Sequence, residues 1–180
     1  HYAFKGCSSL TSITIPNSVT SIEWSAFLGC SSLKSVKVSN KYCYDYFKKL
    51  GISDITFIVS TLEEYQEAQE AGATKLAIDS KYASEDGLCL IDNGKLILFI
   101  GKDLTEYTIP ESVTSIGERA FEGCSSLKSV KVANKYCYNY FKDKVANIAF
   151  YGANASDDGR CLIIDGVLEA FKAEGITEYT

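Results

Sequence analysis

The chain has 180 residues, of which 46% are hydrophobic, and it carries a formal net charge of −5. This apolar content is sufficient to bury a continuous core, whereas the acidic balance argues against a nucleic-acid partner, because phosphate binding normally requires a basic stripe. No apolar run approaches the roughly 18 residues of a membrane span, so direct membrane insertion is not expected.

Three short segments share one strand pattern. Residues 10–15, 33–38 and 127–132 each begin with leucine and carry apolar side chains at the first, fourth and sixth positions. The last three positions therefore alternate as in a half-buried β-strand. The pattern predicts that six side chains point inward, namely Ile13, Ile15, Val36, Val38, Val130 and Val132.

Short helices are expected after two of these strands. One-sided apolar spacing predicts a helix that starts near Asn40 and ends before Gly51, with a duplicate that starts near Asn134. Residues 61–72 begin with a Thr-x-x-Glu capping box and end on glycine, which predicts a further short helix.

Two hairpins are expected in the second half of the chain. Residues 89–99 and 161–171 place Asn93-Gly94 and Asp165-Gly166, respectively, between apolar runs. Both dipeptides tolerate the positive φ that a tight turn demands, so each segment predicts a β-hairpin.

The sequence repeats itself at several lengths. Residues 16–48 return as residues 110–142 with seven differences in 33 positions, and a shorter Ala-Phe-x-Gly-Cys-Ser-Ser-Leu string at residues 3–10 returns 23 residues later. Residues 86–108 return as 158–180, at an offset of 72 instead of 94, so the second copy lacks 22 residues. Nested periods of this kind indicate a stacked-repeat architecture.

The repeat motifs also resemble a known family. The string from Ile15 to Ile22 followed by Ala26 to Leu33, and the closely similar string from Ile109 to Cys124, resemble the repeat of BspA-type leucine-rich-repeat proteins. Residues 39–80 and 134–157 depart from the pattern and are interpreted as insertions or irregular rungs. The resemblance implies a secreted or surface-attached microbial adhesion protein that binds host or neighbouring-cell macromolecules.

The predicted fold is a mainly β (α/β repeat) solenoid of leucine-rich-repeat-like stacked strands with hairpin and short helical insertions. We expect residues 1–180 to form a single solenoid fragment of a longer array, because both ends fall inside a repeat. Duplicated modules are expected at approximately residues 1–80 and 81–180.

The exposed face of the stacked strands is the candidate partner-binding surface. Parallel stacking at about 4.8 Å would align the outward side chains of successive rungs, and solenoids use such extended faces for binding. The alternative is that these are ordinary solvated strand residues. The candidate residues are Ser12, Thr14, Ser35, Lys37, Glu106, Thr108, Ser129 and Lys131.

The seven cysteines fall into three classes of equivalent position. This equivalence predicts small buried packing residues, because thiols are among the most buried side chains. The alternative is disulfides between Cys30 and Cys43 and between Cys124 and Cys137, although an odd total leaves at least one thiol unpaired. The classes are Cys7, Cys30 and Cys124 after Phe-x-Gly, Cys43 and Cys137 in helices, and Cys89 and Cys161 in hairpins.

The sequence offers little for catalysis or for metal and cofactor binding. His1 is the single histidine, so a nucleophile activated by imidazole is not expected, and without a C-x-x-C motif no zinc site is expected. Acidic pairs that include Asp86 and Asp158 precede the hairpins; we interpret them as solvated turns, with an acid/base pair or a calcium site as the alternative. No glycine-rich phosphate loop is present.

Two functions remain from these observations. The first is a noncatalytic extracellular or cell-surface module that binds a host or neighbouring-cell surface or matrix protein, or a glycan, through its repeat-built face. The second is an architectural spacer of a cell-surface protein without its own ligand. Neither requires a cofactor.

Overall fold

The computed structural model describes residues 2–164 and 167–171, and the chain divides into two compact units. Unit 1 comprises residues 1–83 and unit 2 comprises residues 84–180. Each unit contains parallel strands stacked rung on rung, as the repeats led us to expect. The single continuous solenoid over residues 1–180 stays a prediction.

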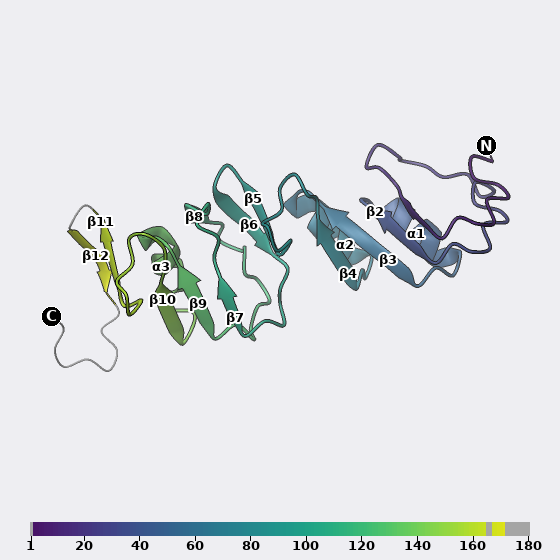
Figure 1. The fold of residues 1–180 in the computed structure, drawn as a ribbon. Coiled ribbons are helices and arrows are strands. Elements are labelled where there is room, and N and C mark those ends of the chain that lie inside the picture. Colours follow the sequence, from purple (N-terminus) through teal and green to yellow (C-terminus); the bar gives the residue numbers. More distant parts are fainter. Residues whose placement is uncertain (1, 165–166, 172–180) are drawn as a thin grey trace. The chain divides into compact units, whose positions relative to one another are not determined.

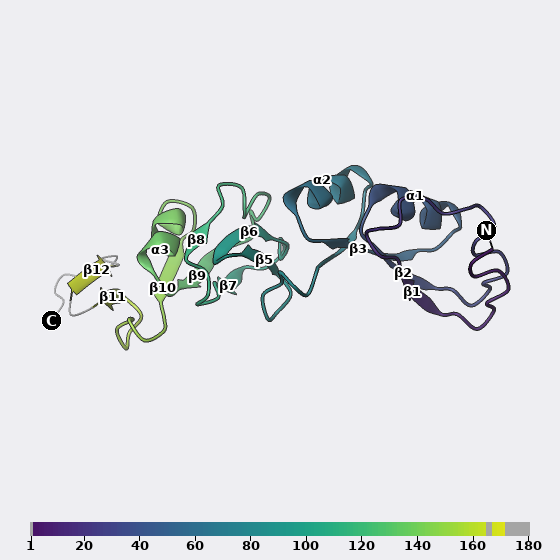
Figure 2. The ribbon, with the colours of Figure 1, turned by 90° about the horizontal axis from the view of Figure 1, so that it is seen from above.

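Unit 1 is built on one parallel sheet of four strands in the order β1-β2-β3-β4. Figure 1 labels β2, β3 and β4, and Figure 2 labels β1 beside β2. The strands are β1 (Ser12–Thr14), β2 (Ser35–Val38), β3 (Asp54–Val59) and β4 (Lys75–Ile78). Ile13 pairs with Val36, and Val36 pairs with Ile55, so the apolar positions of successive rungs align. This alignment follows from the shared alternation, because a shift by one residue would turn every apolar side chain outward.

Two helices connect the last three strands of this sheet. Helix α1 (Lys41–Lys49) follows β2 and helix α2 (Leu62–Glu70) follows β3, and both cover the same side of the sheet (Figure 2). Of the two interpretations of residues 39–80, the structure supports rungs and not insertions, because β3 and β4 extend the parallel ladder. The helices are the return segments of these rungs.

Both helices begin at the expected capping residues. The Asn40 side chain accepts a hydrogen bond from the Cys43 N–H at 2.9 Å and donates one to the Val19 carbonyl at 3.0 Å. Thr61 accepts from the Glu64 N–H at 3.2 Å, while the Glu64 carboxylate accepts from the Ser60 N–H at 2.6 Å. The Asn40 side chain thus also joins its helix to the preceding rung.

The inward positions of unit 1 are buried as predicted, with one exception. Ile15, Val36 and Val38 are at most 5% exposed. Ile13 is only half-buried, because β1 is an edge strand and borders an apolar hollow of about 350 Å³ together with Val19. The sequence pattern assigned Ile13 to the correct face of the sheet, but it did not predict that Ile13 is partly exposed at the edge strand.

Unit 2 begins with the first predicted hairpin. Strands β5 (Cys89–Asp92) and β6 (Lys95–Phe99) pair antiparallel around Asn93 and Gly94, both of which adopt positive φ. Strand β6 also pairs in parallel with the short strand β8 (Ser115–Ile116).

A second sheet of unit 2 contains three parallel strands. Strand β9 (Ser129–Val132) lies between β7 (Glu106–Thr108) and β10 (Asn147–Phe150), and helix α3 (Lys135–Phe141) connects β9 to β10. Asn134 caps α3 as Asn40 caps α1, with bonds of 2.9 Å from the Cys137 N–H and 2.7 Å to the Val113 carbonyl. The two copies of the repeat therefore use the same local structure.

The second hairpin consists of β11 (Cys161–Ile164) and β12 (Val167–Phe171), which pair antiparallel. Its predicted turn, Asp165-Gly166, lies outside the described residues. Cys161 and Leu162 are buried, whereas Val167 and Leu168 are each 57% exposed.

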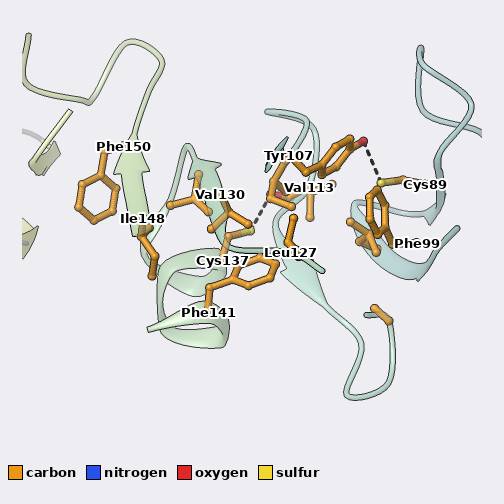
Figure 3. Close-up of a cluster of buried hydrophobic side chains, with 14 of the residues drawn as sticks. Cys89, Phe99, Tyr107, Val113, Leu127, Val130, Cys137, Phe141, Ile148 and Phe150 are labelled. Atoms are coloured by element: carbon orange, nitrogen blue, oxygen red, sulfur yellow. Dashed lines mark hydrogen bonds between the residues drawn. The ribbon is translucent and has the colours of Figure 1, made fainter. Parts of the chain in front are cut away.

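The core of unit 2 lies between the hairpin β5-β6, the parallel sheet and α3. Figure 3 shows Phe99 near Tyr107, and Phe141 beneath Val130 and Leu127. Val130 and Val132 are at most 1% exposed, as predicted. Leu96 of the hairpin is fully buried, and so is Val113, the counterpart of the half-buried Val19 of unit 1.

Candidate functional site

The four candidate residues of unit 1 lie side by side on the outward face of the sheet. Ser12 pairs with Ser35, and Thr14 pairs with Lys37, so that two short polar rows cross β1 and β2. All four are exposed or half-buried. The predicted alignment of this part of the face is confirmed.

The next two strands extend these rows with residues that sequence reasoning missed. Asp54 continues the first row, Thr56 continues the second, and Lys75 follows Thr56 on β4. Lys75 forms an ion pair with Asp54 across the face. The hydrogen bond from Lys75, and then that from Ser35, hold the pKa of Asp54 below its ordinary value. Asp54 therefore remains a carboxylate that is already paired.

The four candidate residues of unit 2 form the equivalent rows on its parallel sheet. Glu106 pairs with Ser129, and Thr108 pairs with Lys131. These four residues also line a hollow of about 410 Å³, together with Asp86, Leu88 and Tyr107. The hollow makes this part of the face concave, which favours ligand contact over a flat row of solvated side chains.

The Asp86 carboxylate at the border of this hollow is held in a fixed position. It accepts hydrogen bonds from the Ser84 hydroxyl, from the Leu88 N–H at 3.0 Å and from the Tyr107 hydroxyl at 2.8 Å. Burial alone would raise the pKa of Asp86, but these three donors outweigh it and hold the pKa below its ordinary value. Asp86 is thus a fixed negative charge beside the hollow.

Asp86 lies in a turn, as predicted for the acidic pair Glu85-Asp86. The same arrangement recurs at Asp158, which accepts from the Ser156 hydroxyl at 2.6 Å and from the Arg160 N–H at 3.0 Å. Among the residues that the structure describes, no group of acidic, histidine and cysteine side chains is arranged to hold a metal ion.

Tyr107 and Cys89 lie behind Asp86 in the core. The Cys89 Sγ is 3.1 Å from the Tyr107 hydroxyl oxygen, a contact that Figure 3 draws as a dashed line. Burial raises the pKa of Cys89 from its ordinary value of 9.0 to about 11, and burial likewise raises the pKa of Tyr107. A thiol that stays protonated is a poor nucleophile, so this contact fastens the hairpin to β7 without activating Cys89.

All seven cysteines are free thiols, so the disulfide alternative is not observed. The helix and hairpin classes are buried as predicted, but the class after Phe-x-Gly is not: Cys30 and Cys124 are half-buried and Cys7 is exposed. The preceding rung covers Cys30 only in part, and the Cys30 thiol donates a hydrogen bond to the Phe4 carbonyl of that rung at 3.0 Å. Within the described residues, no rung precedes that of Cys7.

Two contacts between neighbouring rungs were not predicted from the sequence. Asp54 and Lys75 are 21 residues apart, as are Asp86 and Tyr107. Residues about one rung apart lie on neighbouring strands, but the rung length varies: Ser35 pairs with Asp54 only 19 residues further on, whereas the clear sequence repeats have a period of 23. That period would therefore not have located Asp54 or Lys75.

Comparison with known protein families supports the repeat architecture described above. The family described as "BspA type Leucine rich repeat region" matches residues 1–75 and 97–156, in six copies. Neither a search of curated proteins nor a search of solved structures finds a match. The chain therefore belongs to the BspA-type leucine-rich-repeat family, whose members are repeat proteins, often surface-associated and generally noncatalytic. Within the described part of the chain, no helix is long and apolar enough to cross a membrane.

Proposed function

We propose that this BspA-type leucine-rich-repeat chain is a noncatalytic extracellular binding module that holds a surface or matrix protein of a host or neighbouring cell. A glycan displayed on such a protein is included in this ligand class. The main proposed contact surface is the outward face of the parallel strands of unit 2, which includes the hollow; the outward strand face of unit 1 is considered as a surface of its own.

The observation that supports the proposal most strongly is the composition of this hollow. Four of the eight candidate residues line it, and they combine a carboxylate, a lysine and two hydroxyl groups within about 410 Å³. Glu106, Lys131 and Thr108 are exposed, so their polar groups are available to hydrogen-bond an incoming ligand. Leu88 and Tyr107 add apolar wall area, as in ligand pockets generally.

The face of unit 1 differs in a way that favours the hollow as the main contact. The charged side chains of Asp54 and Lys75 on this face already form an ion pair with each other. An exposed pair of this kind contributes little to stability, but it has to be broken before either group can bind a ligand. We therefore place unit 1 in a supporting role.

The proposal can be tested with a pair of equivalent lysines. Lys131 lines the hollow, whereas Lys37 occupies the same position of the near-identical repeat in unit 1. The intact chain is screened against immobilised matrix proteins and glycans, and each ligand that binds saturably at micromolar concentration is tested with K131A and K37A. We expect K131A to weaken binding about tenfold, equivalent to about 1.4 kcal/mol, and K37A to weaken it less.

The architectural spacer makes the opposite prediction. A spacer needs rungs but no recognition surface, so no ligand would bind saturably and neither lysine variant would have a binding phenotype. Equal loss of binding in both variants would instead place the contact on the strands of both units and would contradict the central role of the hollow.

A further inference from the structure

The two copies of the 33-residue repeat diverge at one place above all others. Four of their seven differences fall within residues 23–28. Trp24 and Leu28 of unit 1 correspond to Glu118 and Glu122 of unit 2, and at the same offset Leu50 corresponds to Lys144. Apolar residues in one copy are therefore replaced by charged residues in the other.

These three residues of unit 1 are exposed around a hollow of their own. Trp24 is 77% exposed, Leu28 is 50% exposed and Leu50 is 48% exposed. They border a hollow of about 290 Å³ at the turn before β2 and the end of α1, with Phe27 and Leu33 in its walls. No charged side chain lines it. We call Trp24, Leu28 and Leu50 the apolar patch.

Unit 2 shows that folding does not require an apolar patch. The corresponding hollow of unit 2, about 560 Å³, keeps the apolar residues Phe121 and Leu127 in its walls but is bordered by Glu118, Glu122 and Lys144. The surrounding rung has an equivalent strand and an equivalent helix with the same asparagine cap, although α3 is seven residues long and α1 nine. Charged side chains at these positions are therefore compatible with the fold, and the apolar side chains of unit 1 are not needed for it. Exposed apolar patches of this kind mark interaction sites.

The size of the patch decides between two occupants. A tryptophan side chain offers on the order of 150 to 250 Å², and with two half-exposed leucines the patch presents on the order of 300 Å². A stable dimer needs about 800 Å² from each partner. The patch is therefore too small to hold a second copy of the chain by itself, but it is sufficient for one bulky side chain and its neighbours.

We propose that the apolar patch is a docking site for a short, extended peptide segment of a protein partner, anchored by one bulky uncharged side chain in the 290 Å³ hollow. Trp24 forms the flat wall against which the anchor packs, which suits the enrichment of tryptophan at the energetic centres of interfaces. The walls offer few polar groups to a sugar, so a peptide anchor is favoured over a glycan. This site is separate from the strand face proposed above.

The single tryptophan of the chain provides a direct assay. A library of random 12-residue peptides is selected against the intact chain, and enriched peptides are titrated while the fluorescence of Trp24 is recorded. We expect these peptides to share one bulky apolar residue, to shift the emission to shorter wavelength and to bind at micromolar concentration. The double variant L28E/L50K, which retains Trp24 and carries the unit 2 residues, is expected to bind at least tenfold more weakly.

A transplant provides the matched control. The changes E118W, E122L and K144L build the patch onto unit 2 in the L28E/L50K background, and we expect them to restore binding. Three outcomes would overturn the proposal: enriched peptides without a bulky apolar residue, equal binding to L28E/L50K, or a failure of the transplant to restore binding. A chain that sediments as a dimer only when the patch is intact, or a glycan whose binding requires Trp24, would assign the site to another occupant and would overturn it as well.

Discussion

The side chain of Asn40 is expected to stabilise unit 1 through two hydrogen bonds at once. It accepts from the Cys43 N–H at the start of α1 and donates to the carbonyl of Val19 in the preceding rung. The variant N40A removes both bonds, whereas N40S keeps an acceptor for the helix but is too short to reach Val19. The two variants therefore separate the cap from the connection between rungs.

The magnitude follows from these two contacts. Loss of an asparagine cap costs about 1 kcal/mol, and loss of the partner of a half-buried carbonyl costs about 1 kcal/mol more. We expect N40A to lower the free energy of unfolding by about 2 kcal/mol, which is about thirtyfold in the folding equilibrium. N40S is expected to cost about half as much.

Urea unfolding of N40A and N40S, and of the equivalent variants N134A and N134S, can be followed by far-UV circular dichroism. The Asn134 contacts are at least as short as those of Asn40, so similar costs are expected. A cost below about 0.5 kcal/mol for N40A would refute the claim that Asn40 joins the helix to the preceding rung. Equal costs for N40A and N40S would show that the cap contributes nothing.

Three further predictions follow from burial and charge. Burial raises the pKa of the Cys89 thiol to about 11, so the stability that comes from keeping this thiol protonated is complete below pH 9 and is lost as the pH rises toward 11. Over this range the free energy of unfolding should fall by about 2 to 3 kcal/mol more in the native chain than in C89A. Parallel pH profiles of the two proteins in urea unfolding would contradict this. L96A should cost about 2 to 5 kcal/mol because Leu96 is fully buried, whereas L168A at the equivalent hairpin position should cost less than about 0.5 kcal/mol because Leu168 is 57% exposed; calorimetry that ranks them in the reverse order would refute the burial argument. Finally, K75A should lower the free energy of unfolding only slightly, and this loss should shrink in 1 M salt because the pair with Asp54 is exposed; a loss that is unaffected by salt would exclude an electrostatic origin.

The local elements of this fold were predictable because each repeats a short-range pattern. Alternation placed Val36 and Val130 inward, and asparagine at the cap position marked the start of two helices. Asn93-Gly94 marked the first hairpin, since a turn with positive φ at both residues selects these residue types. For the same reason, the eight candidate residues could be assigned to the outward faces of their respective sheets.

The role of residues 39–80 could not be predicted in the same way. Their strands lack the Leu-x-x-Val-x-Val pattern, and only pairing with β2 shows that they are rungs. The exposure of Ile13 and Cys7 was likewise missed, because burial at these positions depends on what lies against an edge and not on the residue itself. The divergence at Trp24 was visible in the sequence, but its meaning required the exposed surface.

By itself the sequence determined the strands of the clear repeats, the helix caps, the first hairpin turn and the outward position of the candidate residues, since all of these depend on residues within one period of the chain. The tertiary structure decided which residues of different periods meet: Asp54 with Lys75, Asp86 with Tyr107, and the side chains that border each hollow. The physical reason is register. Contacts between rungs depend on how the parallel strands align across rungs of unequal length, and that alignment is set by packing of the whole unit.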